Sequence, residues 1–120
     1  MRLGAIAVAA VVVAGWACAS SGTKNTPISK APTPSNAEEV VIYEYKFIPF
    51  TMTVRAGTTV TWVNHDVAPH TATHRSFSDE PFDSGNMLAT QIFRHTFRKP
   101  GTYDYLCILH QGMRGTVVVE

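Results

Sequence analysis

The feature that most constrains the fold is an alternation of apolar and polar residues that recurs through residues 38–120. In TVTWVN it places Val60, Trp62 and Asn64 on one face, as in a half-buried strand. Turn formers such as Ala56-Gly57 separate such runs, and no segment of this region has a helical period. The pattern predicts an all-β, antiparallel sandwich or barrel of about seven or eight short strands.

The expected strands are short, β-branched and aromatic. They lie in 40–47, in two runs within 50–66 on either side of Ala56-Gly57, and in 70–74, 90–97, 102–107 and 115–120. Residues 79–87 are rich in turn formers and predict a loop. Trp62, Phe97 and Tyr105 are the expected aromatic core.

The size and charge of the chain limit the classes of function that it can have. The chain has 120 residues, about one domain's length, with 45% hydrophobic and 16% charged residues. This composition is ordinary for a globular protein. The formal net charge of +1 gives no strong field that would favour nucleic acid as a partner.

Residues 1–19 have the layout of a secretory signal. Arg2 provides a positive start, and an Ala- and Val-rich apolar stretch runs from Leu3 to Val13. This stretch is shorter than the about 20 residues that a membrane-spanning helix needs. The protein is therefore expected to be exported, to the bacterial periplasm or the outer face of the membrane.

Two interpretations of the processing site remain open. Ala17-Cys18-Ala19 matches an A-x-A cleavage site, which would make Ser20 the first mature residue. Alternatively the signal ends before Cys18, and Cys18 carries the lipid anchor of a bacterial lipoprotein. Polar, proline-containing residues 20–37 predict a flexible linker in either case, followed by a folded domain over 38–120.

Both interpretations leave Cys107 as the one thiol of the folded domain, because Cys18 is either removed or thioether-linked. A single thiol in an oxidising compartment becomes oxidised or cross-linked unless it is buried or occupied. A bound metal ion would protect it.

Cys107, His110 and Met113 form the pattern C-x2-H-x2-M after the predicted strand 102–107. A tight loop between two strands could aim all three side chains at one point. His70, which follows a strong predicted strand, is the best candidate for a fourth ligand. Two imidazoles, a thiolate and a thioether are the ligand set of a blue copper site, with methionine as the long axial ligand.

Residues 40–120 resemble the cupredoxins of the plastocyanin, amicyanin and pseudoazurin group. The resemblance rests on TVTWVNHDVAPHTAT, FDSG and F-x2-PGTYDYLC-x2-H-x2-M-x-G-x-V-x-V. The short C-x2-H-x2-M loop is most similar to amicyanin. The resemblance implies a Greek-key β-sandwich, electron transfer, and one type 1 copper ion held by His70, Cys107, His110 and Met113.

Two positions depart from the group's pattern. Thr71 stands where several relatives have asparagine, and its hydroxyl could still bridge two loops. Leu109 stands where relatives often have proline, so its N–H could donate to the Cys107 sulfur and raise the reduction potential. Leu109→Pro is then expected to lower that potential.

The remaining histidines are expected to have no part in the copper site. His65 is expected to be solvated, and His95 to lie on the outward face of its strand. His74 shares a strand face with His70, which leaves a second metal site there as a minor alternative.

Redox proteins are expected to dock briefly at an apolar patch around His110, which would serve as the electron port of a monomer. Pro69, Leu109 and Gly112 are the expected patch residues.

The leading function is therefore a small exported electron carrier and not an enzyme. A copper enzyme would need a second copper site with additional histidines, which a domain this short does not provide. A periplasmic copper chaperone or store is the main alternative, although a tight Cys/His2/Met site would release copper slowly. A structural zinc domain is weaker, because methionine is a poor zinc ligand.

Overall fold

A computed structural model describes residues 32, 38–75, 77–78 and 80–120. The predicted signal (1–19) and, apart from Pro32, the predicted linker (20–37) lie outside the described residues, so the two interpretations of Cys18 stay predictions. Nothing helical in the described part of the chain is long and apolar enough to cross a membrane.

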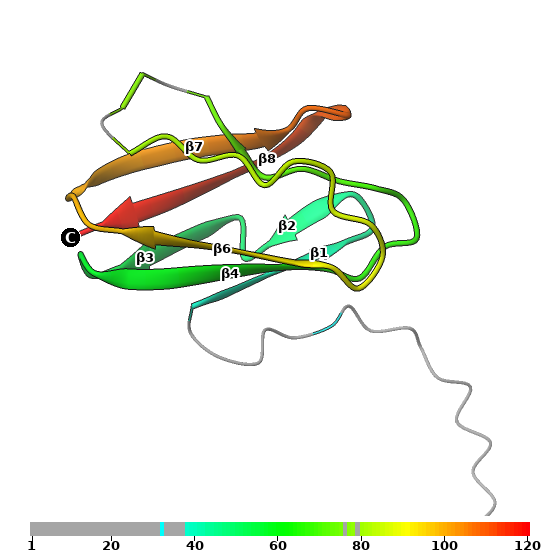
Figure 1. Cartoon of the computed structure of the whole chain (residues 1–120), viewed down its shortest axis with the longest axis horizontal. Coiled ribbons are helices and arrows are strands. Elements are labelled where there is room, and N and C mark those ends of the chain that lie inside the picture. Colours follow the sequence, from blue (N-terminus) through cyan, green and yellow to red (C-terminus); the bar gives the residue numbers. More distant parts are fainter. Residues whose placement is uncertain (1–31, 33–37, 76, 79) are drawn as a thin grey trace, which may run out of the picture.

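The described residues form eight strands and no helix, and Figure 1 shows the strands packed as two facing layers. One four-stranded sheet has the order β2-β1-β4-β6, and the other has the order β3-β8-β7-β5. The strands are β1 (Glu39–Tyr43), β2 (Lys46–Ile48), β3 (Thr51–Val54), β4 (Thr58–Asn64), β5 (Thr73–His74), β6 (Ile92–Phe97), β7 (Gly101–Cys107) and β8 (His110–Val119). The predicted all-β sandwich is confirmed.

The sheets are mixed, so the predicted antiparallel pairing holds for four of the six pairs among the described strands. β1 pairs parallel with β4, and β3 pairs parallel with β8. The predicted turn at Ala56-Gly57 is present, with Gly57 at a φ of +93° that glycine adopts readily. However, it sends β3 and β4 into different sheets. Alternation along a strand reports which face is buried and carries no information about strand direction.

The run 40–47 was expected as one strand and forms two. β1 and β2 make an antiparallel hairpin in which Tyr43 lies opposite Lys46. The turn residues Glu44 and Tyr45 have φ values of 48° and 59°, in the left-handed region that non-glycine residues rarely adopt. The extra turn explains why there are eight strands, where the sequence pattern resolves seven.

Aromatic side chains fill the space between the sheets. Trp62, Phe97 and Tyr105 are buried, as predicted. The Tyr105 ring lies directly against Gly115 on the neighbouring strand, where a Cβ would come within 2.4 Å of the tyrosine hydroxyl oxygen. Only glycine fits beneath this ring in its present position.

His95 does not face outward as predicted, because residues two apart on a strand share a face. It lies opposite Val60 on β4, and its ring packs against two phenylalanine rings. The ring centres are 5.0 Å apart for Phe82 and 4.8 Å apart for Phe97. His74 stacks on Phe82 at 5.5 Å, and the Nε2 atoms of both histidines are buried without a hydrogen-bond partner. The imidazoles of His74 and His95 therefore lie on either side of Phe82. β5 and β6, which carry the two histidines, are edge strands of the two sheets.

This arrangement predicts that acid destabilises the fold. Burial lowers the pKa of both His74 and His95, against the opposing effects of Asp104 and Glu80 respectively. The unfolded chain takes up protons near pH 6.5, whereas the folded chain resists them, so the free energy of unfolding should fall as the pH drops below about 6.5.

His95→Leu should reduce this pH dependence between pH 7 and 5, measured by urea unfolding. His65→Gln, at an exposed histidine, is the matched control and should leave the slope unchanged. An unaltered slope in His95→Leu would show that burial of this ring does not cause the acid sensitivity.

Candidate metal centre

The segment after β4 is folded around the buried side chain of Asn64. Its amide nitrogen donates to the carbonyl oxygens of Ala68 (2.9 Å) and Met87 (3.0 Å), and its oxygen accepts from the Asp66 N–H (2.9 Å). His70 and Met87 then exchange two backbone hydrogen bonds, of 3.1 and 2.8 Å. These contacts hold His70 at the end of the sandwich, with no exposed surface.

The other candidate ligands come from a hairpin tighter than the predicted loop. β7 ends at Cys107, only Ile108 and Leu109 form the turn, and β8 begins at His110, which pairs with Cys107. Met113, expected on the loop, therefore lies within β8, where it is buried. Strand pairing thus fixes the spacing of the two ligand candidates on either side of the turn.

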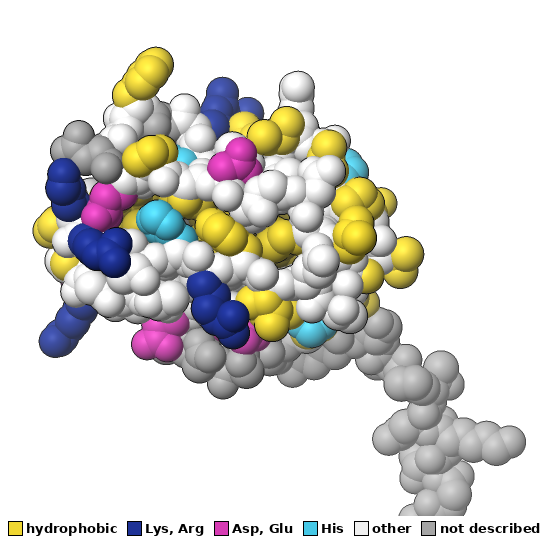
Figure 2. Space-filling view, in the orientation of Figure 1, with side chains coloured by type: hydrophobic (Ala, Val, Ile, Leu, Met, Phe, Trp, Pro, Cys, Tyr) yellow, Lys and Arg dark blue, Asp and Glu magenta, His cyan; other side chains and the backbone are white. Residues whose placement is uncertain are grey.

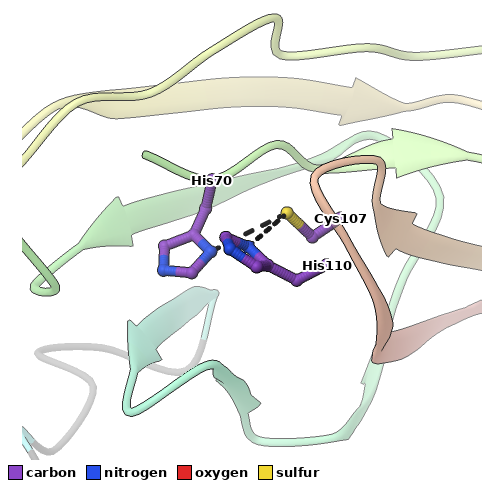
Figure 3. Close-up of side chains that lie close together, drawn as sticks. All are labelled: His70, Cys107 and His110. Carbon is purple, nitrogen blue, oxygen red and sulfur yellow. Dashed lines mark hydrogen bonds between the residues drawn. The ribbon is translucent and has the colours of Figure 1, made fainter. Parts of the chain in front are cut away.

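Three of the four predicted ligand side chains converge in space (Figure 3). The Cys107 Sγ lies 3.7 Å from Nδ1 of His70 and 3.5 Å from Nδ1 of His110, and the three atoms lie within 4.8 Å of one another. A nitrogen about 2.0 Å and a sulfur about 2.3 Å from one metal ion would be about 3.5 Å apart. The donor set and its two sulfur–nitrogen distances therefore fit a single copper ion.

A carboxylate orients His70 from the side away from Cys107. Asp66 Oδ2 lies 2.8 Å from His70 Nε2, and the same carboxylate accepts the N–H groups of Glu44 (2.7 Å) and Tyr45 (3.0 Å). Burial acts to raise the pKa of Asp66, but these two N–H groups and His70 outweigh it and lower the pKa. The ionised carboxylate favours a proton on Nε2, which leaves the Nδ1 lone pair directed toward Cys107.

Asp66 and Tyr45 are the site residues that sequence reasoning missed. The only signal for Asp66 was its position four residues before His70. Tyr45 gave none, because an aromatic residue in a β-rich run is ordinary.

Thr71 bridges the two loops, as predicted from its hydroxyl. The Ile108 N–H donates to Thr71 Oγ1 (2.9 Å), while the Thr71 N–H donates to the Cys107 sulfur (3.3 Å). The expected hydrogen bond from Leu109 to this sulfur is not among the bonds formed by the described residues. The N–H that this turn directs into the site is that of Ile108, and it donates to Thr71. Without a bond from Leu109 to the sulfur, Leu109→Pro is no longer expected to lower the reduction potential.

The other predictions about the surroundings have mixed outcomes. His110 is half-buried, and Pro69, Leu109 and Gly112 are exposed. Figure 2 shows hydrophobic side chains gathered at the end of the sandwich that carries the β7–β8 turn. His74 packs on Phe82 and does not join His70, and the described residues contain one candidate metal cluster.

Comparison with known proteins identifies this arrangement. Residues 35–120 match the family model described as copper binding proteins of the plastocyanin/azurin family. The chain belongs to the plastocyanin/azurin family. It is 36% identical to the amicyanin of Paracoccus versutus over 100 residues, covering 82% of this chain and 76% of that protein. It is also 36% identical to amicyanin-alpha of Methylorubrum extorquens over 122 residues, covering all of both chains.

Solved structures agree with this membership. A reduced amicyanin variant superposes with a TM-score of 0.66 at 34% identity, covering 75% of this chain and 88% of that one. A copper-containing nitrite reductase from Thermus scotoductus gives a TM-score of 0.66 at 31% identity, covering 74% of this chain. This chain spans only 23% of that reductase, so the likeness concerns one part of a larger protein.

The bridge made by Thr71 should be a measurable source of stability. Thr71→Val keeps the shape of the buried side chain but leaves the Ile108 N–H without its acceptor, which should lower the free energy of unfolding by about 1–3 kcal/mol. Urea unfolding monitored by fluorescence measures this.

Thr59→Val is the control, because it removes an exposed hydroxyl pair with Thr96 between β4 and β6. Equal losses in the two variants would mean that the bridge contributes nothing particular to the site.

Proposed function

We propose that this protein is a small exported blue copper protein that carries single electrons between redox proteins. Its proposed ligands are His70, Cys107, His110 and Met113. The observation that carries the proposal is the convergence of one buried sulfur and two Nδ1 atoms within 4.8 Å. Membership of a copper-binding family and the named amicyanin relatives support copper over zinc.

Copper bound here would supply a one-electron couple between Cu(I) and Cu(II). The protein's contribution is to keep the ligand geometry nearly unchanged between the two states. His70 is held by Asp66 and by its backbone bonds to Met87. Cys107 is held by β7 and by the Thr71 N–H. Thiolate and thioether accommodate Cu(I), and imidazole accommodates both states.

His110 is the proposed electron port. It is half-buried at the start of β8, whereas His70 and Cys107 are fully buried. The exposed Leu109 precedes it, with 46% of its surface accessible. A small apolar surface of this kind suits short-lived docking of redox proteins. A monomer in the periplasm, or one held by a lipid at Cys18, remains part of the proposal.

The alternatives have less support. The chaperone or storage function finds none among the named relatives. An enzyme of the nitrite reductase kind would need a second copper site, and the part of the chain that is described holds one candidate cluster. We therefore propose that the chain acts as a carrier and has no catalytic activity of its own.

The deciding experiment is a visible spectrum of the purified protein after addition of Cu(II). An intense thiolate-to-copper charge-transfer band is expected, and Cys107→Ser should abolish it. Cys18→Ser is the matched control and should retain the band, because Cys18 is no ligand under either interpretation. A wild-type protein without this band, or one that binds only Cu(I), would shift the function to a chaperone or store.

A further inference from the structure

The turn between β1 and β2 does more than connect the two strands, because its residues also contact the metal centre. Glu44 and Tyr45 both adopt left-handed backbone conformations although neither is glycine. Such conformations are sterically unfavourable and persist when surrounding contacts hold them. Here the holding contact is the Asp66 carboxylate, which accepts the N–H groups of both residues.

The same carboxylate ties this turn to a proposed ligand. Asp66 Oδ2 contacts the Tyr45 N–H at 3.0 Å and His70 Nε2 at 2.8 Å. One oxygen atom therefore fixes the position of the Tyr45 backbone relative to the His70 ring. A displacement of the Tyr45 backbone would therefore shift the His70 ring, and a displacement of the His70 ring would shift the Tyr45 backbone.

The Tyr45 side chain lies at the end of the sandwich that holds the imidazoles. Phe47, two residues later on β2, points into the sandwich and packs on Tyr105 with ring centres 4.7 Å apart. Tyr45 itself lies in the turn, so its direction is given by its own ring contacts. The centre of the Tyr45 ring lies 4.8 Å from that of His110, with an angle of 88° between the ring planes. The corresponding values for His70 are 5.3 Å and 83°.

One aromatic ring thus contacts both imidazoles nearly perpendicularly, a favourable arrangement for aromatic pairs. The two imidazoles themselves are 4.9 Å apart, so Tyr45 contacts them as a pair. Its remaining surface is open, with 53% of the side chain exposed. An exposed tyrosine would ordinarily rotate freely, but here the strained backbone and two ring contacts restrict it.

We propose that Tyr45 is a positioning residue of the copper site, whose ring holds the His70 and His110 imidazoles in fixed orientation while the metal changes charge. This inference rests on the proposed function. Tyr45 acts through the two ligands and does not bind the metal. Removing its ring frees the half-buried His110 most, because His70 is also held by Asp66.

The test compares Tyr45→Phe, which keeps the ring, with Tyr45→Leu, which keeps bulk but removes the ring. Phe77→Ala, at a fully exposed aromatic residue, is the control. Each full-length variant is loaded with copper, and the self-exchange rate, the reduction potential and the imidazole proton signals of the Cu(I) protein are measured. Outer contacts of metal ligands commonly change metal-site properties about tenfold or more when lost.

Tyr45→Leu is expected to slow self-exchange about tenfold, shift the potential and broaden the His110 ring signals. Tyr45→Phe should stay within about twofold of the wild type, because the ring contacts need no hydroxyl. Nuclear Overhauser contacts between the Tyr45 and His110 rings of the wild type are expected as well, and they do not depend on any variant folding.

The proposal is overturned if Tyr45→Leu keeps the exchange rate, the reduction potential and the sharp ring signals of the wild type. It is also overturned if Tyr45→Phe is as impaired as Tyr45→Leu, or if the ring-to-ring contacts are missing. Failure of the proposed function would look different, because the wild-type protein itself would then lack the charge-transfer band.

Discussion

The metal centre depends on one short connection between segments that are far apart in the sequence. Thr71 donates its N–H to the Cys107 sulfur and accepts the Ile108 N–H on its hydroxyl, across separations of 36 and 37 residues. The loop that carries His70 and the hairpin that carries Cys107 and His110 are thereby held at a fixed distance. This connection extends the pairing of β5 with β7, in which Thr73 lies opposite Leu106, as far as the ligand segments.

The rest of the fold supports that connection at one end of the sandwich. Asn64 closes β4 and shapes the path to His70, while the pairing of β7 with β8 carries the Cys107–His110 turn. The Tyr105 ring packs over Gly115 on the neighbouring strand, where a side chain would clash with it. Each ligand segment therefore starts from a paired strand: His70 follows the end of β4, and Cys107 and His110 lie at the facing ends of β7 and β8.

The sequence predicted the elements that depend on local pattern. Alternation placed Trp62 and Tyr105 in the core, and the C-x2-H-x2-M spacing indicated the metal centre. It could not show that β1 pairs parallel with β4, because alternation is identical for both directions. The outward placement predicted for His95 is wrong, because its spacing of two residues from Phe93 and from Phe97 puts all three on one face.

Residues that act through long-range contacts were beyond such reasoning. The contact between Tyr45 and His110 joins residues near opposite ends of the domain's sequence, and no local sequence pattern indicates it. Asp66 likewise gains its role from the backbone of Glu44 and Tyr45, which becomes available only when the β1–β2 turn folds.

The unequal sequence separation of the ligand candidates has a consequence for how the chain holds together. Cys107 and His110 are three residues apart and already paired, so an ion joining them restricts the chain very little. Joining His70 to Cys107 closes a loop of 37 residues, and a bound ion would act as a cross-link between the two ends of that loop. An ion that binds the folded state alone must leave before this loop can open, so unfolding includes release of the ion. The free energy of unfolding would therefore rise with the logarithm of the free metal concentration.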